Sequence, residues 1–302
     1  MYEIALSVNA CVKNKTRADI AWLVSSSNSV VPMSFDAIAL TPGGGKIGTL
    51  IDSAFDGPLI EHATRKLATG RILTRVVTDF ESILTGLPTG TSLKFAVLPS
   101  DLVEPAVWQS FLDRESVAIV CHIKGDEIVS TDYFNSVTIL AADPTIAEYF
   151  NKKESMIVEL ENQIVTIYHP VTKLVIAGQG PIAEAIEKMA GLLGWNVAIN
   201  SKPSMFAGLT AGLSPMDCAI VMGHDVDTSS QCLSYALDSA AGYIGALGSL
   251  KMQENRADWL AYRDITDLSR IHGPAGFSIG ATTPDEIAIS ILAEAISVLK
   301  GV

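Results

Sequence analysis

Residues 173–200 bring a short apolar run, a glycine-containing turn, a helical repeat and a second apolar run into immediate succession. The first run, 174–177, has the length and β-branched content of a strand buried on both faces of a parallel sheet. After the turn, apolar residues recur at helical spacing from Ile182 to Leu193, and Gly194 is a typical helix stop. This order of strand, turn, helix and strand predicts an α/β fold with a Rossmann-like parallel sheet in the second half of the chain.

The turn fits the pattern G-x-G-x-x-A through Gly178, Gly180 and Ala183. In that pattern the first glycine permits a tight bend, and the second lets a phosphate approach the main chain at the N-terminus of the helix. The pattern is short, so its position between a predicted strand and a predicted helix is what makes it informative. We therefore predict cofactor-binding residues at Gly178, Gln179, Gly180 and Ala183.

The end of the second strand bears on the choice of nucleotide. An NAD site has an acid there to hold the ribose, whereas this chain has Asn200, Ser201 and Lys202. In addition, Pro181 offers no N–H in the first helical turn, and Glu184 places a negative charge close to the helix end. We predict that Asn200 contacts the guest. NAD(P) stays open as an alternative guest, because Lys202 is suited to the 2′-phosphate of NADP.

Two further predicted strands end in residues suited to a ligand crevice. The run 218–222 is followed by His224 and Asp225, and the run 241–247 is followed by Gly248 and Ser249. Residues just past the carboxyl ends of parallel strands face the crevice of an open sheet. We predict these four as cofactor-binding residues that act through main-chain amides and small surfaces, with no catalytic acid or base. A capping or loop role for His224 is the structural alternative.

The charge balance excludes several classes of partner. The 302 residues include 21 Lys and Arg against 33 Asp and Glu, a formal charge of -12 that repels nucleic acid and anionic membrane surfaces. Residues 1–10 lack the positive start of a signal peptide, and no apolar run reaches membrane length, so we expect a cytoplasmic protein without a membrane span. Neither the cysteines nor the histidines show metal-ligand spacing, which predicts free thiols and no metal site.

The first half of the chain predicts a different kind of domain. Apolar runs at 20–24, 37–40, 46–51, 73–77, 93–98 and 117–123 indicate strands, and helical repeats occur near 1–17, 59–67 and 105–112. Gly43-Gly44-Gly45-Lys46 lacks the frame of a phosphate-binding loop and is interpreted as a β-turn. A predicted hairpin at 157–168 leads to the Rossmann-like segment. We therefore expect a mixed α/β domain over residues 1–155 and a Rossmann-like domain over 156–302.

The start of the last helix is also readable. Thr283-Pro284-Asp285-Glu286 combines an N-cap threonine, a proline at the first helical position and a glutamate placed for a capping box. We interpret these acidic residues as structural. The apolar stripe of the helix that follows leaves formation of a homo-oligomer open.

Three segments of the second half resemble the C-terminal Rossmann domain of the XdhC/CoxI family: YIGALGS at 243–249, IHGPAGF at 271–277 and TPDEIAISILAE at 283–294. Members of that family are accessory proteins in the maturation of xanthine dehydrogenase and carbon monoxide dehydrogenase. The resemblance implies a non-catalytic protein that binds molybdenum cofactor (molybdopterin) and delivers it to an apo-molybdoenzyme. Gly178-Gln179-Gly180 and His224-Asp225 fall on the family's glycine turn and strand-end His-Asp pair.

The first half departs from the family's pattern at positions that bear on function. Asp52, Ser53 and Ala54 stand where the family has Gly-Gly-Cys, Asp56 stands for its glutamate, and residues 88–91 replace a second cysteine-glycine pair. A thiolate can ligate a soft metal or take part in sulfur chemistry, whereas alanine can do neither. A mechanism that relies on those sulfurs therefore loses its ligands here.

Three interpretations of the function remain. The leading one is the accessory protein implied by the resemblance, holding a pterin-type cofactor or nucleotide between its two domains. The second is an NAD(P)-dependent oxidoreductase. The third is a degenerate paralogue that has lost its cofactor contacts and acts only as an assembly partner.

Overall fold

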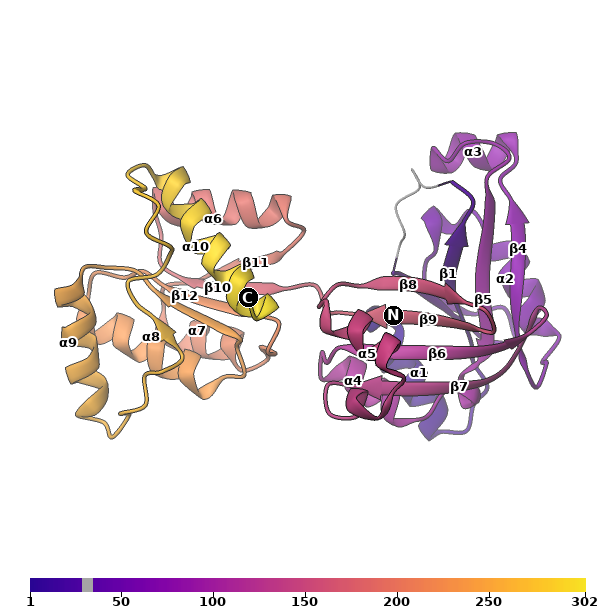
Figure 1. Ribbon diagram of the computed structural model, residues 1–302, viewed down its shortest axis with the longest axis horizontal. Helices are drawn as coiled ribbons and strands as arrows, with labels where there is room; N and C mark the ends of the chain where they lie inside the picture. The colour runs from indigo at the N-terminus through magenta and orange to yellow at the C-terminus, as the bar shows by residue number, and fades with distance from the viewer. Residues whose placement is uncertain (29–34) are drawn as a thin grey trace. The chain divides into compact units, whose positions relative to one another are not determined.

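The computed structural model describes residues 1–28 and 35–302, which form two compact units, Met1–Pro170 and Val171–Val302 (Figure 1). The predicted boundary at 155/156 therefore moves to 170/171. The reason is that the hairpin of β8 (Met156–Leu160) and β9 (Gln163–Tyr168) pairs through β9 with β6 (Val117–Lys124) and so belongs to the first unit.

The first unit is built on a nine-stranded sheet in the order β3-β2-β1-β5-β4-β7-β6-β9-β8, with antiparallel pairing between neighbours. Its other strands are β1 (Asp19–Ser26), β2 (Ala37–Leu40), β3 (Lys46–Gly48), β4 (Gly70–Val76), β5 (Ser92–Pro99) and β7 (Glu127–Asn135). Its helices are α1 (Ala5–Lys13), α2 (Asp56–Thr64), α3 (Asp79–Thr85), α4 (Ala106–Leu112) and α5 (Pro144–Asn151). The expected mixture of helices and strands is confirmed, although β7 and α3 were not predicted.

Two parts of the sheet that are distant in sequence meet inside this unit. The indole Nε1 of Trp22 in β1 donates a hydrogen bond of 3.0 Å to Thr166 Oγ1 in β9, and both residues are buried. Apolar residues of β1, β5, β6 and β9 share one core with α1 and α4. The glycine segment between β2 and β3 is the predicted turn, in which Thr41 N donates to Gly45 O at 2.8 Å.

The second unit contains a parallel sheet of five strands in the order β11-β10-β12-β13-β14. Its strands are β10 (Lys173–Ala177), β11 (Asn196–Ile199), β12 (Cys218–Val221), β13 (Tyr243–Ala246) and β14 (Ile271–His272). Its helices are α6 (Pro181–Leu192), α7 (Pro203–Thr210), α8 (Val226–Asp238), α9 (Leu250–Ala261) and α10 (Pro284–Lys300). The predicted Rossmann-like sheet is confirmed, while α7, α9 and β14 were not predicted.

Helices cover both faces of this sheet (Figure 1). Leu174 and Ile176 of β10 pack in the core that includes α6 and α10, whereas Val175 and Ala177 pack in the core that includes α7 and α8. Burial on both faces explains why β10 is a continuous apolar run rather than an alternating one. Full burial of a Leu, Ile or Val side chain stabilises the fold by about 1.5–3 kcal/mol.

The local signals of the second unit act as predicted. Thr283 Oγ1 accepts the N–H of Glu286, and the Glu286 carboxylate accepts the N–H of Thr283, so α10 begins with a capping box. Cys11, Cys121, Cys218 and Cys232 are free thiols, as expected. No helix within residues 1–28 and 35–302 combines the length and hydropathy needed to cross a membrane.

Candidate functional site

The order of the parallel strands places a crevice beside β10. The chain passes from β10 to β11 on one side and reaches β12 on the other side, so the helices that follow β10 and β12 lie on opposite faces of the sheet. Ligands of open α/β sheets bind at such a switch point, outside the carboxyl ends of the strands. The loops that follow β10 and β12 are the segments at 178–180 and 222–225.

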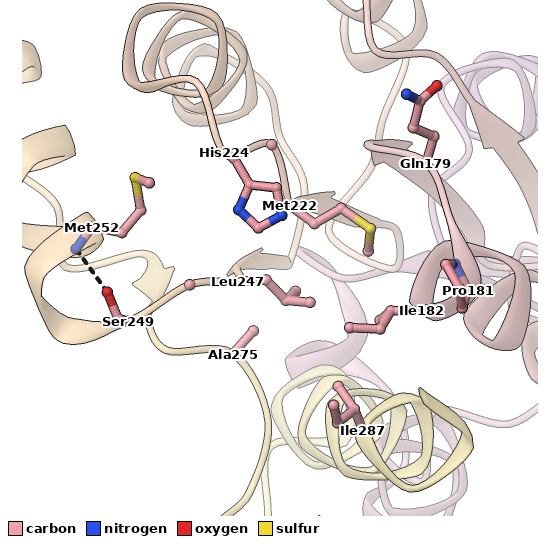
Figure 2. A pocket seen from close by; sticks show the side chains of 12 residues that line it. Gln179, Pro181, Ile182, Met222, His224, Leu247, Ser249, Met252, Ala275 and Ile287 are labelled. Carbon is pink, nitrogen blue, oxygen red and sulfur yellow. Dashed lines mark hydrogen bonds between the residues drawn. The ribbon is translucent and has the colours of Figure 1, made fainter. Parts of the chain in front are cut away.

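Two adjoining hollows occupy this end of the sheet. The larger one has a volume of about 610 Å³, and its wall includes Leu247, Ala275 and Ile287 (Figure 2). The smaller one has a volume of about 220 Å³ and is lined in part by the hydroxyl-bearing residues Ser201, Thr228 and Ser229. The two hollows share four lining residues: Gln179, Met222, Gly223 and His224.

The glycine turn borders the hollows but differs in detail from the prediction. Gly178 lines the smaller hollow, and its carbonyl accepts a hydrogen bond of 3.1 Å from Ser201 Oγ. Gln179 lines both hollows. Gly180 precedes the first residue of α6 with φ of 95°, a backbone conformation that favours glycine, and the space in front of its Cα is open.

Three of the predicted residues line neither hollow: Gly180, Ala183 and Asn200. Ala183 is 1% exposed and packs in the core between α6 and the sheet, so its small size serves close packing of the helix. Asn200 organises the loop after β11, where its Oδ1 accepts the N–H of Lys202 at 3.0 Å. The sequence pattern places Ala183 and Asn200 near the turn but does not reveal which way their side chains face.

The residues after β12 and β13 do reach the hollows. His224 is exposed and lines both hollows. Asp225 lines the smaller hollow and is the N-cap residue of α8. Its carboxylate accepts the N–H of Thr228 at 2.7 Å, and hydrogen bonds from Thr228 lower the pKa of Asp225. Gly248 and Ser249 line the larger hollow, and Ser249 Oγ accepts the N–H of Met252 as the N-cap of α9.

Several lining residues were not predicted. Met222 was assigned only to a strand, and Ala275 and Ile287 lie far along the chain in segments that carry no ligand-binding pattern. Cys232 lines the smaller hollow, where burial raises the pKa of its thiol to about 11, so this sulfur stays protonated at neutral pH. No group of three or more His, Cys, Asp or Glu within the described residues could hold a metal ion.

The main-chain groups at this end of the sheet favour a negatively charged ligand. Helices α6, α8 and α9 all begin at this end of the sheet, and each helix N-terminus carries a partial positive charge. Main-chain N–H groups also remain available, because those of Gly178, Gln179, Gly180, Gly223, His224 and Gly248 have no acceptor among the residues that the structure describes. Such orphan donors, gathered at helix N-termini, are the ordinary means of binding phosphate.

The fold and site together define a Rossmann-type domain with a ligand crevice at its switch point. Comparison with known proteins narrows this class, because residues 174–295 match the family described as the XdhC Rossmann domain. The second unit therefore matches the XdhC Rossmann domain over most of its length, and the predicted resemblance is confirmed over this segment.

Two curated relatives match about half of the chain. The "Uncharacterized protein YqeB" of Escherichia coli (strain K12) is 25% identical over 156 residues, which are 44% of this chain and 28% of that protein. A protein of Bacillus subtilis (strain 168), named as a probable component of xanthine dehydrogenase, is 26% identical over 160 residues, which are 47% of each protein. The aligned segments therefore span less than half the length of either relative.

Among solved structures, a crystal structure described as a xanthine dehydrogenase from Bacillus halodurans aligns with a TM-score of 0.49 and 19% identity. The alignment covers 98% of this chain and 96% of that one.

Proposed function

We propose that this protein is an accessory factor that binds molybdenum cofactor, or a related pterin or nucleotide, and delivers it to a molybdenum hydroxylase of the xanthine or carbon monoxide dehydrogenase type. The observation that carries the proposal is the set of unpaired main-chain N–H groups, within the described residues, around a hollow at three helix N-termini. The XdhC Rossmann match and the name of the Bacillus subtilis relative support the choice of client enzyme.

The residues around the hollow fit a phosphate-bearing pterin. The larger hollow, about 610 Å³, lies in the usual range of roughly 300–1,000 Å³ for small-molecule sites. Its wall combines main-chain donors for a phosphate with the apolar surfaces of Leu247, Ala275 and Ile287 for a ring system. When bound, molybdenum cofactor would supply the metal centre of the client hydroxylase, held by its own sulfur atoms. No ionised thiolate of the chain is needed for that fit.

The same residues favour binding of the cofactor over catalysis of a reaction. A catalytic acid or base is a positioned side chain with a proton to exchange. Here Asp225 is engaged by Thr228, the Cys232 thiol is buried, and His224 is exposed to solvent. The chain would therefore bind and orient its guest through peptide N–H groups and shield one face of the ring from water.

The direct test is retention of the cofactor by the purified full chain. Molybdopterin released from a molybdoenzyme is mixed with the protein, and its survival is followed by its characteristic fluorescent oxidation product. We expect the protein to slow the decay of the cofactor and to retain it on gel filtration. A protein that neither retains molybdopterin nor slows its decay contradicts the proposal.

A pair of substitutions makes the test specific to the hollow. Ala275→Trp places a large ring where Ala275 faces the larger hollow (Figure 2) and is expected to abolish retention. Ala211→Trp, at the exposed end of α7, adds the same bulk elsewhere and is the matched control. Equal retention by the two variants would place the guest outside the hollow.

The same purified protein can be used to test the two alternative functions, an NAD(P)-dependent oxidoreductase and a pure assembly factor. The end of β11 carries Asn200 where an NAD site has an acid, so titration with NADH or NADPH should leave nicotinamide fluorescence unchanged. A pure assembly factor would co-purify with the client hydroxylase while binding no small molecule. Mass spectrometry of the freshly isolated protein distinguishes that case from a cofactor carrier.

A further inference from the structure

Arg256 of α9 is a buried cation whose hydrogen-bond acceptors in the described part of the chain are all neutral. The residue is 1% exposed, and its guanidinium donates to the carbonyl oxygens of Gly223 and Leu247, at 2.7 Å each, and to Ser229 Oγ at 3.0 Å. A weaker contact of 3.4 Å reaches Gln253 Oε1. Burying a charge without a counter-ion is costly, and burial lowers the pKa of this guanidinium, although arginine stays protonated in proteins.

The two carbonyl groups come from the ends of two neighbouring strands. Gly223 follows β12 and Leu247 follows β13, so a single guanidinium fixes both strand-end loops. Gln253, one turn earlier on α9, adds to this by donating to the carbonyls of Ala246 and Gly248 at 3.0 and 3.3 Å. Side chains of one helix therefore form hydrogen bonds with both strand-end loops.

The orientation of a peptide carbonyl also fixes the N–H of the next residue. In a trans peptide the C=O and the following N–H point in opposite directions. The carbonyl of Gly223 points toward Arg256, so the N–H of His224 points away from it, and the same holds for Leu247 and Gly248. Arg256 lines neither hollow, whereas His224 and Gly248 line the larger one.

The conformation of Gly248 agrees with this arrangement. Its φ of 133° lies in the region that favours glycine, and a Cβ there would stand 3.0 Å from Met252 Cγ. The N–H groups of His224 and Gly248 have no acceptor within the described part of the chain. A donor left without an acceptor is costly unless water or a ligand satisfies it.

We propose that Arg256 is a positioning residue that turns the N–H groups of His224 and Gly248 toward the larger hollow, where this amide pair binds a phosphate-type oxyanion. This proposal rests on the proposed function and deepens it. It places the binding site for the anionic end of the ligand at the ends of β12 and β13. That anion-binding site is distinct from the glycine turn after β10. The guanidinium acts through the peptides and does not touch the anion.

The test uses inorganic pyrophosphate as the probe and the full chain, labelled for amide NMR. We expect pyrophosphate to shift the amide resonances of His224 and Gly248 along a single saturating curve. Shifts confined to 178–180 would overturn the amide pair while leaving anion binding, and thus the proposed function, in place. The absence of shifts at both segments would contradict both proposals.

Substitutions then test the role of Arg256. Arg256→Met keeps the length of the side chain but removes its donors, and we expect the affinity for pyrophosphate by calorimetry to fall about tenfold or more. Arg256→Lys, which cannot reach both carbonyls at once, should recover only part of this loss. Lys251→Met removes a charge from the exposed face of the same helix and should change the affinity less than about twofold.

The wild-type protein keeps the test decisive if Arg256→Met does not fold, because the amide shifts need no variant. If the two variants at residue 256 fold and bind pyrophosphate as the wild type does, Arg256 is a structural residue only. If Lys251→Met lost as much affinity for pyrophosphate as Arg256→Met, the loss would be explained by net charge alone. That result would also overturn the proposal.

Discussion

The side chain of Met222 lies directly against Gly178, so that a Cβ at residue 178 would stand 1.9 Å from Met222 Cγ. The thioether thus covers the first glycine of the turn after β10 and stands between the two hollows, both of which it lines. Figure 2 shows Met222 extending toward Gln179 and Pro181. Gly178 is needed for this close approach rather than for an unusual backbone angle, because its φ is not positive.

Substitution of Gly178 should therefore be sensitive to residue 222. We expect Gly178→Ala to lower the free energy of unfolding by about 1–3 kcal/mol, because the new methyl group overlaps Met222. The double variant Gly178→Ala with Met222→Ala should recover much of that loss beyond the effect of Met222→Ala alone. Denaturant unfolding of the four proteins measures this coupling.

A control for the Gly178 variants is available on α6. Nothing lies within 4 Å of a Cβ at Gly191, so Gly191→Ala should stabilise the helix by about 0.5–1 kcal/mol. Additive effects at residues 178 and 222 would show that the two side chains do not compete for the same space.

Asp52 occupies a backbone conformation better suited to glycine. Ile51, Asp52 and Ser53 have φ of 47°, 52° and 65°, and this is the segment where the XdhC/CoxI pattern has glycines. We expect Asp52→Gly to raise the free energy of unfolding by up to about 1 kcal/mol. The change removes the penalty of a left-handed backbone at a non-glycine residue, and the conformational entropy that glycine loses on folding offsets part of this gain. Asp101→Gly, at an exposed position with negative φ, should instead lower it. Equal signs for the two changes would contradict this explanation.

The capping box of α10 makes a defined pH prediction. Hydrogen bonds from the N–H groups of Thr282 and Thr283 lower the pKa of Glu286 from 4.5 to about 2. Because the pKa in the folded state is below the unfolded value, the stabilisation is fully present above about pH 4.5 and is lost as the pH falls toward 2. The stability difference between the wild type and Glu286→Gln should therefore shrink over this interval in denaturant unfolding. A difference that is constant with pH would show that the charge of Glu286 does not matter.

The buried bond between Trp22 and Thr166 predicts a cost for an isosteric change. Thr166→Val keeps the shape of the side chain but leaves the indole N–H without its acceptor, which should lower the free energy of unfolding by about 1–3 kcal/mol. Thr166→Ser keeps the hydroxyl and loses one methyl group, so its cost should be near 1 kcal/mol. Unfolding followed by tryptophan fluorescence measures both, and a smaller cost for valine than for serine would contradict the role of the hydrogen bond.

The elements that the sequence predicted are those with strong local signals. The apolar run of β10, the periodic stripe of α6 and the capping residues of α10 each specify their structure through neighbours within one or two turns. The missed elements lack such signals. Strand β7 is only partly buried and is rich in polar residues, and it is held by pairing with β6 along its length. Helix α9 buries only Arg256 and Leu260, so its apolar pattern is weak.

The candidate site divides in the same way. The sequence by itself determined a parallel sheet, its glycine turn and the segments that follow β10, β12 and β13, because the chain's order of strands and helices fixes which residues reach the carboxyl edge. Only the tertiary structure decided which side chains line the hollows. Ala183 packs in the core and Met222 packs against Gly178. Ala275 and Ile287 line the larger hollow although they lie in distant segments of the chain. Those outcomes depend on packing between residues far apart in the chain, and no local pattern encodes such contacts.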